Sequence, residues 1–287
     1  MHPPVAVLAH AIDYAGLFPP ASLPIRAAVQ SFADYAQSPD GWALGRFVVA
    51  VSQAYELLAA LPEVPGLPEP LPVAVVLDAD PRTSRKALEA LAARVLVGAV
   101  EGRVTQPAEI PRLAPSHQEQ EVYAEVPLRE APAPFVSALA DRGVFGKLRT
   151  GGVTADAFPA PDFLLEWLAA LAHADVPFKC TAGLHHPVRG RYRLTYAPDS
   201  PLGTMYGYLN VMVAGAGLRA GWSDAEAREA LLEDNPIAFS VRGDALAWRD
   251  RELNAGLIRT FRLRGMRGFG SCSFREPLDE LAEVPVA

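Results

Sequence analysis

Lysine is scarce in this chain, and the places where it occurs suggest chemistry. Only three of the 26 basic residues are lysines, namely Lys86, Lys147 and Lys179, and the others are arginines. An arginine side chain stays charged in proteins, whereas a buried lysine can lose its proton and act as a nucleophile. Lys147 and Lys179 each lie in a short aliphatic run that predicts a β-strand. Both are therefore candidates for covalent chemistry.

Alternation along a strand gives these two lysines a common direction. Lys147 shares one face of its predicted strand with Arg149, and Lys179 shares one face of the next strand with Thr181. The opposite faces are apolar and should pack on helices. We therefore expect both lysines to point inward, toward one volume between neighbouring parallel strands.

Two amines in a partly dry pocket could form a Schiff base. Desolvation and a second cation both lower the pKa of a lysine, and Arg149 adds a third positive charge. A neutral Lys147 amine could then attack a carbonyl carbon, and the resulting iminium would draw electrons while a carbon–carbon bond is made or broken. The alternative is that one lysine binds a phosphate or carboxylate while the other pairs with Asp78, Asp80 or Glu125.

The elements that must position these residues alternate between strands and helices. Aliphatic runs buried on both faces and separated by helical patterns predict a parallel sheet with crossover helices. The predicted strands are 5–9, 47–51, 72–77, 95–100, 121–126, 144–148 and 177–181, and 268–274 supplies the eighth. The predicted helices are 25–36, 54–61, 84–93, 135–140, 162–174, 202–219, 225–232, 251–264 and 277–282.

We therefore predict a single TIM-type (β/α)8 barrel domain over residues 1–287, with an open doubly wound sheet as the second choice. Residues 187–267, between the seventh and eighth strands, form an insertion or lid on the barrel. Within it, Ser223 and Glu226 have the spacing of a capping box, and a hairpin is expected around Gly243.

Acidic residues near two strand ends are candidates for proton transfer. Asp78 and Asp80 share a face after the third strand, where they could act as a base or bind a divalent cation. Alternatively, Asp80 caps the following helix, which would begin at Pro81. Glu125 lies in an apolar strand, so we expect it to point inward, pair with Lys147 and move protons.

Two adjacent histidines follow the seventh strand. His185 could act as an acid, a base or a metal ligand, and His186 could contact substrate; both could also be structural. A second hypothesis is therefore a metal-assisted hydrolase or lyase that uses Asp78, Asp80, His185 and His10. A third is a non-catalytic barrel that binds a small anion or serves as a scaffold.

Two further patterns concern binding. A basic run could hold an anionic substrate group over the barrel mouth, although such a run is also typical of a solvated face or a subunit contact; its residues are Arg259, Arg262, Arg264 and Arg267. Glycines along 202–221 give that segment a small-residue edge, which allows close helix packing and would suit a homo-oligomer.

Four short segments resemble the deoxyribose-phosphate aldolases, which are class I aldolases with a (β/α)8 barrel. Lys147-Leu148-Arg149-Thr150-Gly151 resembles their K-T-S-T-G motif in strand six, and Lys179-Cys180-Thr181-Ala182-Gly183 is similar to K-x-S-G-G in strand seven. Phe269-Gly270-Ser271-Cys272-Ser273 resembles G-x-S-S in strand eight, and Ile12-Asp13-Tyr14-Ala15-Gly16-Leu17 resembles the N-terminal I-D-H-T-x-L. The chain also looks like an uncharacterised bacterial barrel family.

The resemblance implies roles for several residues. Lys147 would form the Schiff base, and Lys179 would be the neighbour that lowers its pKa. The segments after strands seven and eight would hold a phosphate or an equivalent anionic group, through Gly183, Gly270 and Ser271, with Ser273 beside them. This chemistry needs no cofactor.

Composition excludes several other classes of protein. The net charge of −7 argues against a nucleic-acid or anionic-membrane partner, and no apolar run approaches the ~18 residues of a membrane helix. The N-terminus lacks the cationic start of a secretory signal. Two cysteines cannot form a disulfide framework and suit a reducing compartment. We therefore expect a cytoplasmic protein whose partner is a small, anionic molecule.

Overall fold

Eight parallel strands form a closed barrel in the computed structural model, which describes residues 5–113 and 120–284. The ring order is β1-β13-β7-β6-β5-β4-β3-β2, so the prediction of a TIM-type (β/α)8 barrel is confirmed. The barrel strands are β1 (Ile12–Tyr14), β2 (Leu44–Ala50), β3 (Pro72–Val76), β4 (Leu96–Arg103), β5 (Glu121–Glu125), β6 (Phe145–Arg149), β7 (Phe178–Thr181) and β13 (Met266–Ser271).

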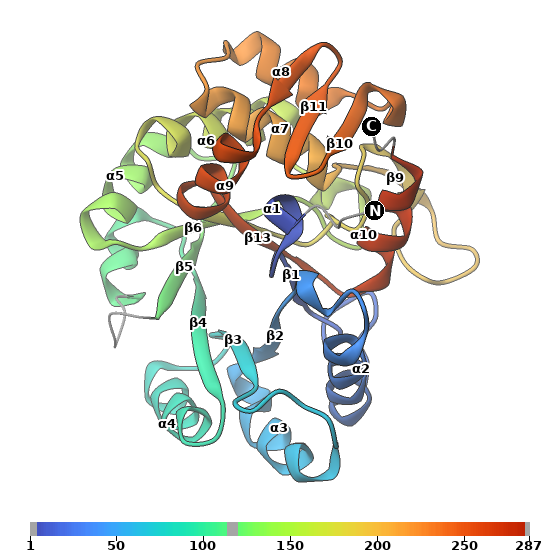
Figure 1. Cartoon of the computed structure of the whole chain (residues 1–287). Coiled ribbons are helices and arrows are strands. Elements are labelled where there is room, and N and C mark those ends of the chain that lie inside the picture. Colours follow the sequence, from blue (N-terminus) through green and yellow to red (C-terminus); the bar gives the residue numbers. More distant parts are fainter. Residues whose placement is uncertain (1–4, 114–119, 285–287) are drawn as a thin grey trace.

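Helices surround this ring and bury their apolar faces against the strands (Figure 1). The helices between barrel strands are α2 (Ile25–Gln37), α3 (Ala54–Ala60), α4 (Pro81–Ala92), α5 (Pro132–Arg142) and α6 (Pro161–His173), and α10 (Arg275–Asp279) follows the last strand. A large aliphatic core fills the layer between helices and barrel, with Trp167 of α6 fully buried in it. The barrel interior holds a much smaller apolar cluster around Tyr123, together with charged side chains.

The first predicted strand is wrong. Residues of the run 5–9 form a short helix, α1 (Val5–Leu8), and the first barrel strand is Ile12–Tyr14. His10 separates the two elements in a left-handed conformation with φ +49°. A five-residue apolar run does not distinguish a buried strand from a buried helix turn, which explains the error.

The segment between β7 and β13 contains three groups of elements, seen at the top and right of Figure 1. They are a hairpin of β8 (Gly190–Arg193) and β9 (Leu202–Met205), the helices α7 (Tyr208–Arg219) and α8 (Asp224–Leu232), and a sheet of β10 (Phe239–Arg242), β11 (Ala245–Trp248) and β12 (Arg251–Leu253) that leads into α9 (Ala255–Arg264).

Sequence patterns predicted part of this segment. The capping box of Ser223 and Glu226 and the hairpin around Gly243 are confirmed. Two predicted helices were too long, because their first residues are the strands β9 and β12. The glycine-rich edge of α7 packs within the chain, where Gly215 lies against Phe261 and Gly217 against Trp222. In the described part of the chain, no helix combines the length and apolar character that a bilayer crossing requires.

The buried side-chain amide of Asn210 connects α7 to the elements beside it through hydrogen bonds. Asn210 is fully buried, and its side-chain oxygen accepts a hydrogen bond from the backbone N–H of Arg189 at 2.8 Å. Its side-chain nitrogen donates to the carbonyl oxygens of Ala230 and Glu233, each at 2.8 Å. A single side chain thus connects the loop before β8 with the end of α8.

We predict that Asn210→Ala lowers the free energy of unfolding by about 2–4 kcal/mol, because three buried hydrogen bonds lose their partner. Urea denaturation of the purified variant measures this loss. Asn235→Ala is the control, since Asn235 only caps the turn at Ile237 and its loss should cost about 1 kcal/mol or less. Equal losses in the two variants would contradict the role given to Asn210.

Candidate active site inside the barrel

A chain of alternating acidic and basic side chains crosses the inside of the barrel. Each member is bonded to the next, and the members come from five of the eight strands. In order, they are Asp13 of β1, Lys179 of β7, Glu101 of β4, Lys147 of β6, Glu125 of β5 and Arg149 of β6. We call these six residues the interior ion network. It contains three carboxylates and three cations.

Glu101 is the centre of the network because it bonds to both lysines. Its Oε1 lies 2.7 Å from Nζ of Lys179, and its Oε2 lies 2.9 Å from Nζ of Lys147. The side chain is 2% exposed. Burial alone would raise the pKa of this carboxyl, but the two ammonium groups outweigh burial and lower it to about 2. Glu101 is therefore ionised at neutral pH.

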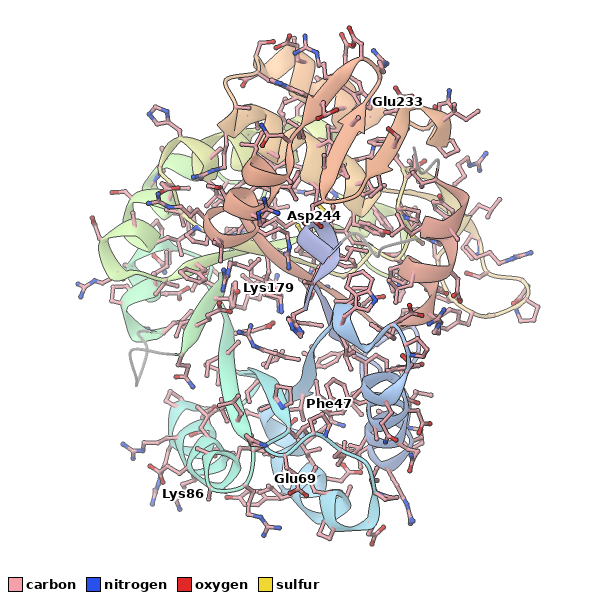
Figure 2. All side chains as sticks on the ribbon, in the orientation of Figure 1. Phe47, Glu69, Lys86, Lys179, Glu233 and Asp244 are labelled. Atoms are coloured by element: carbon pink, nitrogen blue, oxygen red, sulfur yellow. The ribbon has the colours of Figure 1, made fainter. Side chains whose placement is uncertain are left out.

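Lys179, which was expected to be the charged neighbour of Lys147, is held as a cation. Its Nζ bonds to both Asp13 and Glu101 and lies 5.4 Å from the centre of the Tyr123 ring. Burial opposes the charged form, but the two carboxylates raise the pKa of Lys179 well above its usual value. Figure 2 places Lys179 within the ring of strands, whereas Lys86 points outward from α4.

Lys147 lies on the other side of Glu101, and only 5% of its side chain is exposed. Its Nζ lies 3.1 Å from Oε2 of Glu125, so the predicted pairing of Glu125 with Lys147 is confirmed. The two cations beside Glu125 lower the pKa of this carboxyl, although burial would raise it. Glu125 also accepts a hydrogen bond at 2.9 Å from Arg149, whose side chain is 51% exposed. The network thus reaches the surface at the carboxyl end of β6, where Arg149 covers Glu125.

The two aspartates after β3 lie outside this network. Asp78 accepts a hydrogen bond from the backbone N–H of Ser52 at 2.9 Å. Asp80 accepts from the N–H groups of Arg82 and Thr83, which makes it the N-cap of α4. The structural alternative considered for Asp80 is therefore confirmed.

His185 is fixed at the carboxyl end of the barrel. Its Nδ1 lies 3.1 Å from Oγ of Ser271 and 3.3 Å from Oε2 of Glu276. Burial opposes the imidazolium form, but hydrogen bonding to Cys272 and to Glu276 raises the pKa of His185 to about 9. His185 therefore carries a positive charge at neutral pH.

His185 lines a cavity of about 310 Å³ at this end of the barrel, which we call the carboxyl-end cavity. Gly183 and His186 also line it, and so does Arg193 of β8. His186 is held by Glu280, with Nδ1 2.8 Å from Oε2, and stacks on another lining residue, Tyr192. Gly183 has φ +76°, and a β-carbon there would meet Phe158 and the backbone of Gly151, so the chain needs glycine at this turn.

The other residues predicted to bind substrate lie next to this cavity or under it. Thr181 and Gly270 are register partners on β7 and β13. Oγ of Ser271 contacts His185, and Oγ of Ser273 accepts a hydrogen bond from the backbone N–H of Glu276 at 3.2 Å. The structure thus gathers the residues predicted after strands seven and eight around His185 and Glu276.

The residues proposed for a metal site do not lie close together. His185 follows β7 and Asp78 follows β3, and these strands are four apart in a ring of eight. His10 lies before β1 and contacts the carbonyl oxygen of Leu44 through Nδ1 at 3.0 Å. Among residues 5–113 and 120–284, no three His, Cys, Asp or Glu side chains are grouped so that they could hold a metal ion.

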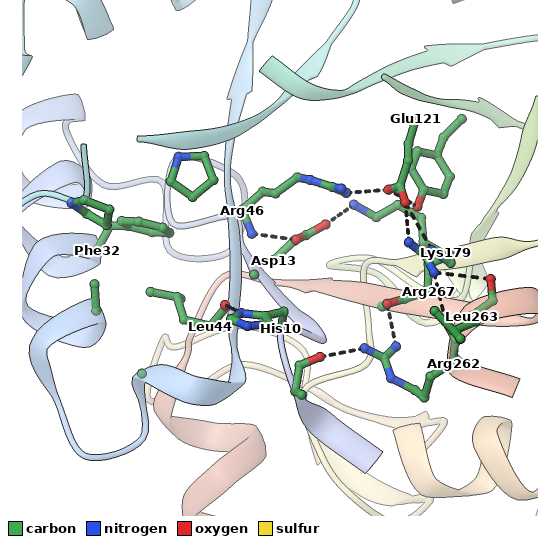
Figure 3. A pocket seen from close by; sticks show the side chains of 18 of the residues that line it. His10, Asp13, Phe32, Leu44, Arg46, Glu121, Lys179, Arg262, Leu263 and Arg267 are labelled. Carbon is green, nitrogen blue, oxygen red and sulfur yellow. Dashed lines mark hydrogen bonds and ion pairs between the residues drawn. The ribbon is translucent and has the colours of Figure 1, made fainter. Parts of the chain in front are cut away.

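A larger cavity, of about 840 Å³, opens at the opposite end of the barrel (Figure 3). Its wall includes Leu44, Pro72 and Glu121, which begin β2, β3 and β5, and it reaches Lys179 and Asp13. We call it the amino-end cavity.

The basic run does not lie over the carboxyl-end mouth of the barrel, where it was expected to be able to hold an anionic group. Arg259, Arg262 and Arg267 line the amino-end cavity and not the carboxyl-end mouth, whereas Arg264 points elsewhere and pairs with Asp175 at 2.6 Å. Arg259, Arg262 and Arg264 lie on α9 and Arg267 lies in β13, and α9 leads into the beginning of β13, which brings the run to the amino end.

Sequence analysis missed Glu101, the residue on which the interior network depends. The predicted strand ended at residue 100, one position before it. A single carboxylate directly after an aliphatic run was the available signal, since a buried charge in a strand needs a partner. Arg46 and Glu121, which line the amino-end cavity, were also missed.

The fold and this interior site define the protein as a TIM-type (β/α)8 barrel with a charged centre. Comparisons of the chain with protein-family models, with curated proteins and with solved structures found no match.

We predict that Glu101→Gln lowers the free energy of unfolding by about 3–5 kcal/mol at pH 7, because both buried ammonium groups lose a charged partner. The pKa of Glu101 is lowered, so its contribution is complete above about pH 4.5 and is lost as the pH falls toward 2. Urea unfolding of the two proteins should therefore converge in acid. Glu89→Gln, an exposed change on α4, is the control, and a Glu101→Gln protein as stable as this control would contradict the prediction.

We also predict a pH dependence that belongs to His185. Its folded pKa is raised from 6.5 to about 9, so its contribution is complete below pH 6.5 and is lost as the pH rises through 9. Unfolding measured at pH 6 and at pH 9.5 should show a drop on the order of 3 kcal/mol that His185→Gln lacks. His173→Gln, at the exposed end of α6, should keep the wild-type drop. The prediction fails if His185→Gln keeps it too.

Proposed function

We propose that the protein is a lyase of the class I, Schiff-base aldolase type, with Lys147 as the nucleophile and a small anionic oxo compound as the substrate. The observation that carries this proposal is the position of Lys147 inside the barrel. Its amine lies between the carboxylates of Glu101 and Glu125, at 2.9 and 3.1 Å, and next to the strand that carries Lys179. The resemblance to deoxyribose-phosphate aldolases assigns the same two lysines.

Lys147 is better suited to this role than Lys179. Both lysines are buried and bonded to two carboxylates, but Lys179 lines the amino-end cavity, away from the carboxyl end of the barrel. Lys147 is bonded to Glu125, whose other partner is the half-exposed Arg149 at the carboxyl end of β6. In (β/α)8 enzymes, chemistry takes place at that end of the barrel. Movement of the Arg149 side chain would open a path to Lys147 from the carboxyl end.

The carboxylates beside Lys147 suit each step of Schiff-base formation. Glu125 accepts a proton from the ammonium, and the free amine attacks the substrate carbonyl to give a carbinolamine. Glu125 returns the proton to the leaving hydroxyl, so that water departs and an iminium forms. When the carbon–carbon bond breaks, Glu125 takes the proton of the hydroxyl that becomes the carbonyl of the first released fragment, and the electron pair of the bond moves into the iminium to give an enamine. Reprotonation and hydrolysis release the product and regenerate the amine.

Charge balance is the same before and after the iminium forms. The iminium carries one positive charge, as the ammonium of Lys147 does, and occupies the same place between Glu101 and Glu125. The buried carboxylates therefore stabilise the intermediate without a new charge entering the barrel. Lys179 keeps Glu101 ionised throughout, and its role is to position that carboxylate.

The carboxyl-end cavity suits an anionic end of the substrate. His185 is cationic at neutral pH, and Arg193 also lines this cavity. Glu276 and Ser271 occupy only Nδ1 of His185 among the contacts seen. A carboxylate or phosphate could therefore bind at the other ring nitrogen, in the place that the resemblance gives to phosphate.

The pairing of both lysines with carboxylates also favours a second candidate, a barrel that binds a small anion without catalysis. In that case the interior ion network would be structural, and Lys147 would remain an ammonium in the presence of carbonyl compounds. The two candidates differ in one chemical property, the formation of an adduct on Lys147.

We predict that borohydride reduction in the presence of small aldehydes and ketones, including anionic oxo acids and sugar phosphates, traps an adduct on Lys147. Peptide mass spectrometry locates it. Lys147→Arg, which keeps the charge, should reduce trapping at least a hundredfold, and Glu125→Gln should slow it about a hundredfold through loss of proton transfer.

Lys86→Arg is the matched control because Lys86 is exposed on α4, and it should trap as the wild type does. Circular dichroism and thermal unfolding check that each variant is folded. The absence of any adduct across the carbonyl panel, or an undiminished adduct in folded Lys147→Arg, would refute the aldolase proposal and leave the anion-binding candidate.

A further inference from the structure

We propose that the amino-end cavity is a second binding site, which takes a small organic anion with a carboxylate or phosphate group on an apolar body. This site lies at the opposite end of the barrel from the carboxyl-end cavity, and Lys147 is not among the residues that line either cavity. The inference stands on the charges and shape of the cavity and does not rest on Schiff-base chemistry.

Positive charge exceeds negative charge in the wall of the amino-end cavity. Three guanidinium groups, those of Arg46, Arg262 and Arg267, line it together with the carboxylate of Glu121. Arg46 Nη1 lies 2.7 Å from Glu121 Oε2, and Arg267 Nη2 lies 2.6 Å from Glu121 Oε1. Glu121 also accepts a hydrogen bond from Tyr123 at 2.8 Å. Both oxygens of Glu121 are therefore occupied, and one carboxylate offsets only one of three cations.

The other charges at this cavity do not remove the excess. Asp13 accepts a hydrogen bond from the backbone N–H of Arg46 at 2.7 Å, but its other oxygen is bonded to the ammonium of Lys179. Arg259 pairs with Asp244 at 3.1 Å and so adds no free charge. Among the described residues around the cavity, the three guanidinium groups and the one carboxylate of Glu121 thus leave a net charge of +2.

Arg262 is the clearest part of this excess. Its guanidinium donates to backbone carbonyl oxygens, those of Ala9 at 2.9 Å and Met266 at 2.8 Å and that of Arg267. Within the described ranges it forms no ion pair with a carboxylate. Burial and the neighbouring Arg267 lower the pKa of Arg262 to about 10, although the charges of Asp13 and Glu121 act in the opposite direction. An anion in the cavity would supply the missing charge.

The rest of the wall indicates what carries the anionic group. Apolar side chains also line the cavity, namely Phe32, Ala36, Leu44, Pro68, Pro72 and Leu263. The volume of about 840 Å³ is that of a typical small-molecule site. Arginine forks bind carboxylate and phosphate oxygens in pairs. The occupant is therefore an amphipathic anion rather than a bare inorganic ion.

The test measures binding of three probes with the same ring by isothermal titration: benzoate, phenyl phosphate and the uncharged benzamide. We expect at least one anion to bind, more tightly than benzamide by a factor of ten or more, and with an affinity that falls as salt increases. Whichever of the two anions binds more tightly shows whether the site prefers a carboxylate or a phosphate group. Inorganic phosphate is included and should bind more weakly than phenyl phosphate.

Two variants locate the binding. Arg262→Gln removes the unpaired cation, and Leu263→Glu adds a carboxylate at an exposed rim position, 64% exposed, where the fold is not at risk. Each should weaken anion binding at least tenfold. Arg264→Gln, on the same helix but paired with Asp175, and Ile237→Glu, at an exposed site outside this cavity, are the matched controls and should bind as the wild type does.

Several outcomes would overturn the proposal. These are no binding of either anion, equal binding of benzamide, or binding that folded Leu263→Glu leaves unchanged. The measurement does not involve the reactivity of Lys147, so a protein that fails to form an adduct can still bind an anion here. A protein that is trapped on Lys147 can likewise fail this test, and the two proposals are tested separately.

Discussion

Burial of charge inside a closed barrel is the constraint on which the rest of this structure depends. Glu101 is 2% exposed and bonds to two ammonium groups from different strands. An unpaired ion at this depth would cost several kcal/mol, so each cation and carboxylate needs a partner of opposite charge. The parallel register sets Glu125 beside Lys147 on β5 and β6, while Glu101 of β4 and Asp13 of β1 reach the lysines across the barrel interior. The arrangement that neutralises the barrel centre is also the one that sets the lysines beside carboxylates.

The balance of cations and carboxylates differs between the two ends of the barrel. At the carboxyl end, the network reaches solvent through the pair of Glu125 and Arg149, and cations and carboxylates balance. At the amino end, the arginines outnumber the carboxylates, and Lys179 and Asp13 form the floor of the cavity. Asp13 connects the two regions, because one oxygen bonds to Lys179 and the other accepts from the backbone of Arg46. An anion at the amino end would therefore act on the same carboxylate that holds Lys179.

Sequence patterns predicted the barrel better than the site. Seven of the strands were found because aliphatic runs buried on both faces are a strong local signal, whereas the run 5–9 was too short to distinguish a strand from α1. Alternation also placed Lys147 and Lys179 correctly inside the barrel. It could not show that Glu101 joins them, because strand β4 is not adjacent to β6 or β7 in the ring, and contact across a barrel interior depends on tilt and stagger. The suggestion that the basic run could lie over the barrel mouth was wrong for a similar reason, since the position of the run depends on how α9 enters β13.

The scarcity of lysine is consistent with different structural roles for lysine and arginine in this protein. Arginine occurs where a permanent charge and several donors are useful, as in the hydrogen bonds of Arg262 to three carbonyl groups. Inside the barrel the cation must fit between carboxylates from different strands, and the compact ammonium of lysine does so where a planar guanidinium would need more room. This geometric reason accounts for Lys179 without any catalytic role. Lys147 differs in the end of the barrel that its partners face, because Glu125 leads to Arg149 at the carboxyl end, whereas Lys179 and Asp13 line the amino-end cavity. Under the proposed Schiff-base chemistry, Glu125 would take the proton of Lys147 and movement of Arg149 would give the substrate its route.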